Sequence, residues 1–373
     1  MATTELESLS AAPPTLYDVV QMTDRPDAAR ATFDLNGKGQ LAFGELDETG
    51  QLRGRFYDGG NFHAVGMLAV QESAPKIALN DMGQVAGQAV FGENVFHAFR
   101  WSRASGIADL GLLAGTDESL ATDINNKGEV VGVARRLDQS VPARAVLWRP
   151  GARPIDLRVR GTVFPTLKNN DAGQVAGTTT GENGFEQAFS WTKSGGPLLL
   201  CGKGIRFSDA RDINAKGQIA SLLGRREFTG YLWSPGCSLS EFVGDGPVPF
   251  ALNDHGTIVG VKQALNRVCV DPARGAVNLG TFAGGSYSIA WDVNLREQVV
   301  GEAGTLESAR LPVDPARRFG RPQYAASQPA CLSLQLVSAR QINDSGTIVA
   351  FTSNNILVLL VPVPVAASAL YLQ

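Results

Sequence analysis

Residues 121–132 read ATDINNKGEVVG: an apolar residue and Asn, two variable residues, Gly, and then a small apolar run. The same pattern stands earlier in the chain as IALNDMGQVAG at residues 77–87. Asn at the first position of a four-residue turn can cap backbone N–H groups, and Gly tolerates the positive φ that such a turn requires. The pattern therefore predicts a tight turn between two short strands.

Eight copies of this signature extend through nearly the whole chain. The turn asparagines are Asn36, Asn80, Asn125, Asn170, Asn214, Asn253, Asn294 and Asn343. Self-similarity at a period of about 40–50 residues indicates a repeat architecture. One turn departs from the pattern because Glu297 stands where the others have Gly, so we expect that turn to be strained or rearranged.

Each repeat consists of short stretches rich in Val, Ile and aromatic residues, separated by Gly, Asn and Asp. This is the pattern of strands and turns, and no segment keeps a helical period, so helices should be nearly absent. Four tryptophans recur at one strand position, where we expect them to pack between repeats. They are Trp101, Trp148, Trp191 and Trp233.

Four-stranded units repeated radially are the blades of a β-propeller. We predict an all-β fold, a single closed β-propeller of eight four-stranded blades, with seven blades as the alternative. The last repeat lacks a fourth strand, and residues 16–22 (LYDVVQM) form an unpaired strand candidate that would complete it. The predicted organisation is a flexible segment at 1–15, the propeller at 16–361 and an apolar, Pro-containing tail at 362–373.

Composition excludes several classes of protein. Of the 373 residues, 44% are hydrophobic and 18% charged, which is typical of a globular chain rather than a disordered one. The net charge is −3 with no basic stripe, so we expect no nucleic-acid partner. The four cysteines lack metal or redox spacing, and we predict neither a metal nor a cofactor. The start of the chain does not resemble a secretory signal, which favours a cytoplasmic location.

The apolar segment 356–372 raises the question of a membrane anchor. It contains Pro362 and Pro364, and its first residues fall where the last repeat needs a strand. A strand followed by an apolar tail is therefore the favoured interpretation, and we expect no membrane partner.

The repeats resemble the HAF-repeat proteins, named for a His-Ala-Phe triplet seen here at His97-Ala98-Phe99. Residues 279–294 (LGTFAGGSYSIAWDVN) and 123–132 (DINNKGEVVG) are similar to the family's repeat unit. The resemblance covers about residues 32–358 and implies a propeller-like array usually described as extracellular. It brings no established catalytic residues, and the location is not carried over because no signal segment is visible.

Equivalent positions in the eight repeats separate scaffold from candidate function. The residue before each turn Asn is aliphatic in seven repeats and Asn169 in the fourth, which predicts a packing ring. One position earlier, four repeats have Asp and the fourth has Lys168. These polar residues either form a cation-attracting inner lining or cap backbone N–H groups of the inner strands.

The third position before the turn Asn is chemically mixed. It is occupied by Phe33, Ile77, Thr122, Leu167, Arg211, Phe250, Trp291 and Arg340. An apolar wall with a few convergent cations is typical of a ligand mouth. The alternative is uneven packing with the arginine heads in solvent. From this set we take Thr122, Arg211, Phe250, Trp291 and Arg340 as ligand-binding candidates, together with Lys168 and the loop residues Arg25 and Arg206.

The linker loops supply the candidate catalytic residues Glu118, Asp209 and Tyr287. Glu118 follows Asp117, and two carboxylates in different environments could divide acid and base roles, although adjacent loop acids are ordinarily just solvated. Arg206 with Asp209 could orient an anion or form a surface pair. The three histidines have no matching Ser or Cys motif, so a nucleophilic triad is not indicated.

Two functions remain open from the sequence. The first is a binding module that engages a small ligand or a protein partner at the mouth of the central channel. The second is a cytoplasmic β-propeller enzyme of bacterial secondary metabolism, a cyclase, isomerase, lyase or hydrolase that acts without metal or nucleophile. The sequence does not indicate an oligomeric state.

Overall fold

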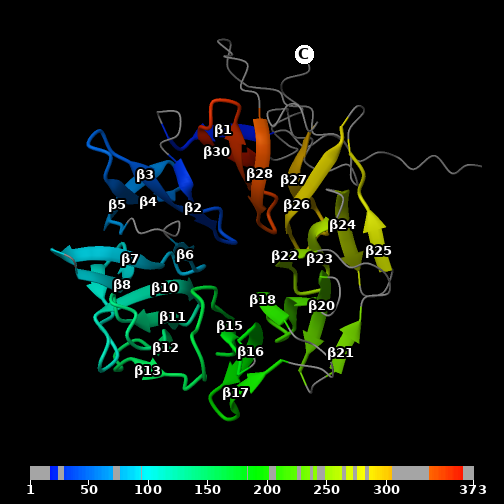
Figure 1. Cartoon of the computed structure of the whole chain (residues 1–373). Coiled ribbons are helices and arrows are strands. Elements are labelled where there is room, and N and C mark those ends of the chain that lie inside the picture. The colour runs from blue at the N-terminus through cyan, green and yellow to red at the C-terminus, as the bar shows by residue number, and fades with distance from the viewer. Residues whose placement is uncertain are drawn as a thin grey trace, which may run out of the picture.

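Eight inner strands surround one axis in the computed structural model of the chain (Figure 1). The structure describes residues 17–23, 29–69, 76–93, 95–182, 184–200, 207–224, 228–235, 238–241, 248–262, 266–271, 275–281, 285–304 and 336–363. Each inner strand ends at the residue before a turn Asn, and the strands that follow lie progressively farther from the axis. The predicted all-β propeller is therefore confirmed.

The first four blades are four-stranded antiparallel sheets. Blade 1 contains β2 (Ala29–Leu35), β3 (Leu41–Leu46), β4 (Leu52–Asp58) and β5 (Asn61–Met67). Blade 2 contains β6 (Ile77–Leu79), β7 (Val85–Gly92), β8 (Val95–Ser102) and β9 (Gly106–Asp109). Blade 3 contains β10 (Glu118–Ile124), β11 (Val130–Arg135), β12 (Arg144–Trp148) and β13 (Ile155–Asp156). Blade 4 contains β14 (Lys168–Asn169), β15 (Val175–Thr180), β16 (Glu186–Thr192) and β17 (Gly196–Leu199).

The remaining blades continue in the same order around the axis. Blade 5 contains β18 (Phe207–Ile213), β19 (Ile219–Gly224), β20 (Phe228–Ser234) and β21 (Ser238–Glu241). Blade 6 contains β22 (Val248–Leu252), β23 (Ile258–Lys262), β24 (Asn266–Asp271) and β25 (Gly275–Asn278). In the described residues blade 7 contains β26 (Tyr287–Val293) and β27 (Val299–Gly304). Blade 8 contains β28 (Leu336–Ile342), β29 (Ile348–Thr352) and β30 (Leu357–Pro362).

The N-terminal strand completes the last blade. β1 (Tyr17–Gln21) pairs antiparallel with β30, which gives the sheet order β1-β30-β29-β28. Buried side chains of blades 8 and 1 pack together in one cluster, among them Leu41, Phe43, Phe351 and Leu359. The predicted closure by the 16–22 segment is confirmed for its described residues, and the seven-blade alternative is wrong.

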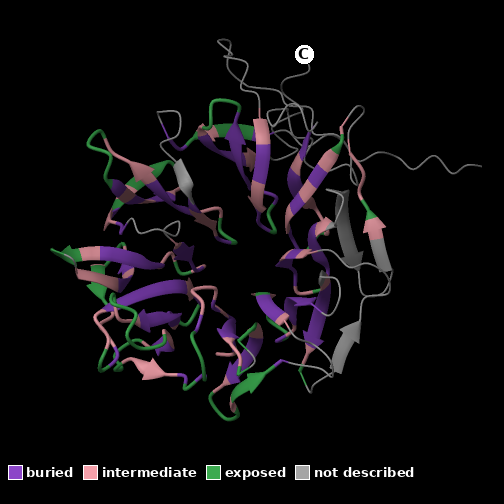
Figure 2. Ribbon diagram, viewed as in Figure 1, coloured by how far each residue is buried: buried purple, intermediate pink, exposed green. Residues whose placement is uncertain are grey.

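Tryptophans pack neighbouring blades together, as predicted. Trp101 lies in a cluster shared by blades 1 and 2, Trp148 in one shared by blades 2 and 3, and Trp191 in one shared by blades 3 and 4. Trp233 does the same between blades 4 and 5, and its indole N–H donates to Ser221 Oγ at 2.6 Å. Figure 2 shows buried residues concentrated on the second strands of the blades, such as β11, β19 and β29, whereas the outer strands β9 and β17 are largely exposed.

The described residues contain no helix, so no helix long and apolar enough to cross a membrane is found among them. The start of the apolar C-terminal segment forms β30, as predicted, and its residues 357–360 are buried. Residues 364–373 of the predicted tail and the predicted flexible segment 1–15 lie outside the described residues.

Candidate functional site

The turn asparagines form a closed ring of hydrogen bonds around the axis. Each Nδ2 donates to the backbone carbonyl of the turn Asn in the next blade, at 2.8–3.0 Å, and Asn343 donates to Asn36. The Oδ1 of Asn125, for example, accepts from the backbone N–H groups of Lys127 and Glu129 within its own turn. Each side chain of this kind shapes its turn and joins two blades at the same time.

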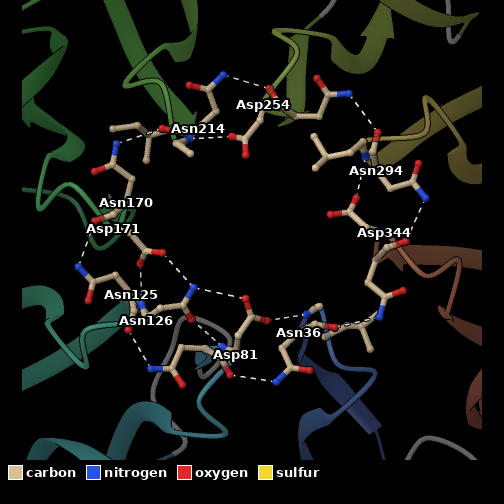
Figure 3. A pocket seen from close by; sticks show the side chains of 18 of the residues that line it. Asn36, Asp81, Asn125, Asn126, Asn170, Asp171, Asn214, Asp254, Asn294 and Asp344 are labelled. Atoms are coloured by element: carbon tan, nitrogen blue, oxygen red, sulfur yellow. Dashed lines mark hydrogen bonds between the residues drawn. The ribbon is translucent and has the colours of Figure 1, made fainter.

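A second ring lies beside the first, at the residue after each turn Asn (Figure 3). Five of these side chains accept a hydrogen bond from the equivalent backbone N–H of the preceding blade, at 2.7–2.8 Å. They are Asp81, Asn126, Asp171, Asp254 and Asp344. Both rings line a cavity of about 420 Å³, which we call the turn-side cavity. Sequence reasoning missed the second ring because it compared only the positions before the Asn.

Glu297 keeps the turn of blade 7 in the common geometry. Its φ is +59°, and its backbone N–H donates to the Asn294 carbonyl as the turn glycines do. Its carboxylate accepts from Asn253 Nδ2 and Thr257 Oγ1, both at 3.1 Å. Four residues after Asn253 stands Thr257, where most other repeats have Gln or Glu as the acceptor for the turn Asn. The turn is thus strained but not rearranged, and Glu297 supplies the acceptor that Thr257 cannot.

The four aspartates two positions before the turn Asn cap backbone N–H groups of the next blade. Their carboxylates accept from the N–H groups of Leu79, Asn169, Leu252 and Ile342 at 2.8–2.9 Å; the acceptors are Asp34, Asp123, Asp212 and Asp292. Gln341 does the same for Leu35 at 3.0 Å. Of the two interpretations of these aspartates, the structure gives the capping role.

Burial makes this aspartate ring electrostatically unusual. It raises the pKa of Asp34 and Asp212 to about 6 and that of Asp292 to about 7, with Lys168 opposing the rise at Asp34 and Asp212. Lys168 lies 3.6 Å from an Asp123 oxygen, and the attraction of Asp123 raises the pKa of the Lys168 ammonium. Lys168 is therefore firmly charged, and it compensates several acids at once.

Beyond the aspartates lies a second cavity of about 380 Å³, which we call the strand-side cavity. Six of the eight residues at the mixed third position line it; they are Phe33, Ile77, Thr122, Leu167, Arg211 and Phe250. In five blades this third residue is skipped by the strand pairing, as Thr122 and Arg211 are. Such β-bulges re-aim a side chain out of the regular ladder. The bulges explain why this position varies while the strands around it do not.

Three cations from three blades line the strand-side cavity: Lys76, Lys168 and Arg211. Arg211 is fixed by Asp209, whose second oxygen accepts from Thr178 Oγ1; both distances are 2.7 Å. Two residues of the lining, Thr32 and Thr166, have a buried Oγ1 with no hydrogen-bond partner among the described residues. Since buried polar atoms are normally paired, these two hydroxyls are exceptions in the part of the chain that the structure describes.

A stacked group adjoins the cavity at Phe250. The rings of Phe250 and Trp291 are 4.7 Å apart, and the Arg340 guanidinium lies 4.2 Å from the centroid of Trp291. Arg340 also lies 3.4 Å from a Glu302 oxygen, which in turn accepts from Ser338. The structure thus places Phe250 on the cavity wall, with Trp291 and Arg340 behind it.

The predicted catalytic residues do not meet in one place. Glu118 is buried between blades 2 and 3, where it accepts from Gln88 and Arg135 and does not line the strand-side cavity. Asp209 adjoins the cavity through Arg211. Burial raises the pKa of the Tyr287 phenol, as does the nearby Glu302.

The ligand-binding candidates divide into three groups. Thr122, Lys168, Arg211 and Phe250 line the strand-side cavity, and the Thr122 hydroxyl donates to the Leu167 carbonyl at 2.8 Å. Trp291 and Arg340 lie in the adjoining stack. Arg25 and Arg206 lie outside the described residues. Among the residues that are described, no group of three or more His, Cys, Asp or Glu could hold a metal ion.

Sequence reasoning missed Lys76, although a signal was present. It stands four positions before a turn Asn, where the eight repeats have Thr32, Lys76, Ala121, Thr166, Ala210, Pro249, Ala290 and Ala339. A lysine in a column of small residues is conspicuous once the comparison is carried one position farther.

No family model and no curated protein matches this chain. Its fold is similar to the WD40 β-propeller domain of Doa1, at 13% identity over 92% of this chain and 96% of that one, with a TM-score of 0.48. It is also similar to virginiamycin B lyase from Staphylococcus aureus, at 10% identity over 93% of this chain and 99% of that one, with a TM-score of 0.44. A prolyl endopeptidase is similar at 8% identity over 73% of this chain and 46% of that one, with a TM-score of 0.49. These are similarities of β-propeller fold alone.

Proposed function

We propose that this β-propeller is a binding module that holds a small organic anion in the strand-side cavity. The observation that carries the proposal is the convergence of Lys76, Lys168 and Arg211, from three different blades, on one cavity. Its volume of about 380 Å³ lies within the range of small-molecule sites. The apolar wall of Phe33, Leu167 and others suits an apolar or aromatic portion of the ligand.

The arrangement favours an anion over a neutral ligand. Arg211 uses one edge of its guanidinium on Asp209, which holds the head in place and leaves further N–H donors. Lys168 stays charged because of the aspartates near it. Hydrogen bonds from charged donors are about twice as strong as neutral ones, so a carboxylate or phosphate gains most from this site.

The enzyme alternative with Glu118 as an acid or base has less support, because both oxygens of that buried carboxylate have partners. A protein partner is also less supported than a small molecule, since the donors lie inside a cavity rather than on a flat face. Membership of the HAF-repeat group and the cytoplasmic location remain predictions from the sequence.

Isothermal titration calorimetry with benzoate, phenyl phosphate and succinate tests the proposal, with benzamide and benzylamine as neutral and cationic comparisons. We expect the anions alone to bind. Arg211→Met should weaken binding by about 2 kcal/mol, on the order of 30-fold in Kd, because one charged donor is lost. Arg53→Met is the matched control, since Arg53 lies on β4, pairs with Asp47 and does not line the cavity. Equal binding by wild type and Arg211→Met, or no preference for anions, would overturn the proposal.

A further inference from the structure

Lys76 is the one charged residue in a column of small ones, and its amine differs from the other cations of the strand-side cavity. Lys168 has Asp123 and Arg211 has Asp209 as ion-pair partners. Within the described ranges, Lys76 makes no ion pair and no side-chain hydrogen bond, although it is half-buried and lines the cavity. The Lys76 amine therefore lines the cavity without being engaged by another side chain of the described residues.

The charges around Lys76 disfavour its protonated form. Burial, together with the charges of Lys168 and Arg211, lowers the pKa of this amine to about 8, against the opposing attraction of Asp123 and Asp209. An ordinary lysine titrates near 10.4, so Lys76 has a far larger neutral fraction at pH 7.5. A desolvated amine next to other cations is the condition under which lysine acts as a nucleophile.

We propose that Lys76 forms an imine with a small oxo acid bound in the strand-side cavity. The inference rests on the proposed anion site: Lys168 and Arg211 would hold the carboxylate, and the carbonyl carbon would face the Lys76 amine.

The step balances without an oxidant or a reductant. The neutral Nζ attacks the carbonyl carbon with its lone pair, and the carbonyl π electrons move to oxygen, which takes up a proton. The resulting carbinolamine transfers a proton from nitrogen to solvent, and its hydroxyl leaves as water after protonation. An amine, a carbonyl compound and one proton therefore give a protonated imine and one water. The positive imine nitrogen can then draw electrons from the neighbouring carbon–carbon or carbon–hydrogen bonds.

Reductive trapping tests the proposal. The full chain is incubated with pyruvate and cyanoborohydride at pH 7.5, digested, and the reduced adducts are located by peptide mass spectrometry. We expect Lys76 to be labelled at least about tenfold faster than the exposed Lys127 and Lys193 of the same sample, because binding raises the local concentration of the carbonyl. Acetone, which lacks the carboxylate, should show no such preference.

Two variants and the pH dependence of labelling distinguish imine formation from anion binding alone. Lys76→Arg keeps a positive charge but removes the attacking amine, so no lysine of this variant should show a preferred adduct. Arg211→Met should weaken benzoate binding about 30-fold and lose the preference for Lys76. The ratio of labelling at Lys76 to labelling at Lys127 should fall above pH 8, where exposed lysines continue to gain reactivity.

Each outcome has one meaning. Preferred labelling of Lys76 that depends on Arg211 supports the imine. Uniform labelling with intact benzoate binding overturns the imine and leaves the anion site in place. Uniform labelling without benzoate binding overturns both proposals.

Discussion

The asparagine of each turn has a second role besides capping its own turn, which is to hydrogen-bond to the next blade. Asn and Asp are nearly equivalent as the first residue of such a turn, because either oxygen can cap the backbone N–H groups. The structure needs the amide as well, since each Nδ2 donates to the next blade's carbonyl. This cross-blade bond explains why none of the eight turns uses Asp.

Asn125→Asp tests this at the residue scale. The new carboxylate would face the Asn170 carbonyl and Glu129 in place of a donor, at a buried position. We expect a loss of about 3 kcal/mol in the free energy of unfolding, measured by urea denaturation. Asp254→Asn is the matched control: its oxygen still accepts from Ala215, so its effect should stay within about 0.5 kcal/mol. Equal effects of the two variants would contradict the role of the ring.

At the scale of elements, β1 supplies the fourth strand of the last blade. It covers the edge of β30 and brings the buried side chains of Tyr17 and Met22 to the last blade. Deleting residues 1–22 should lower the free energy of unfolding by about 4 kcal/mol, from two lost apolar side chains, and expose a strand edge that favours aggregation. Thermal unfolding and size-exclusion chromatography measure both effects. Deletion of residues 1–15, which leaves β1 intact, is the control and should behave as wild type. A stable, monomeric 23–373 protein would show that closure does not depend on β1.

For the whole molecule, the aspartates around the axis couple stability to pH. The pKa of Asp292 is raised by burial to about 7, above its value in the unfolded chain, so the folded state binds the proton more tightly. Stability from this group is therefore full below about pH 4 and declines as the pH rises towards 7.

Asp292→Asn isolates this contribution because Asn does not titrate. The unfolding free energy of wild type minus that of the variant should fall by about 3 kcal/mol between pH 4 and pH 7 and level off above about pH 8. Urea denaturation at several pH values measures the difference, and any constant effect of the substitution cancels from its slope. A difference that is flat or rises with pH would contradict the raised pKa.

Much of the candidate site could be located from the sequence by comparing equivalent positions. The mixed third position before each turn Asn does line the strand-side cavity in six blades, and Lys168 and Arg211 stood out in their columns. Lys76 was missed because it stands four positions before its turn Asn, one position beyond those compared. That it lines the cavity is evident only from the folded arrangement of the inner strands. The partners that engage Glu118, chiefly Arg135 and Gln88, lie far from it in sequence and could not be inferred.

The sequence by itself determined the repeat architecture and the turns, and it indicated the strand that completes the last blade, because each follows from a local pattern of apolar and turn residues. Only the tertiary structure decided which polar residues are scaffold and which are free. The aspartates of the inner strands cap neighbouring blades, whereas Lys76 faces a cavity without a partner among the described residues. Whether a charged side chain has an ion-pair or hydrogen-bond partner depends on groups that folding brings together from different blades. The spacing of residues along the chain does not give the distances between those groups.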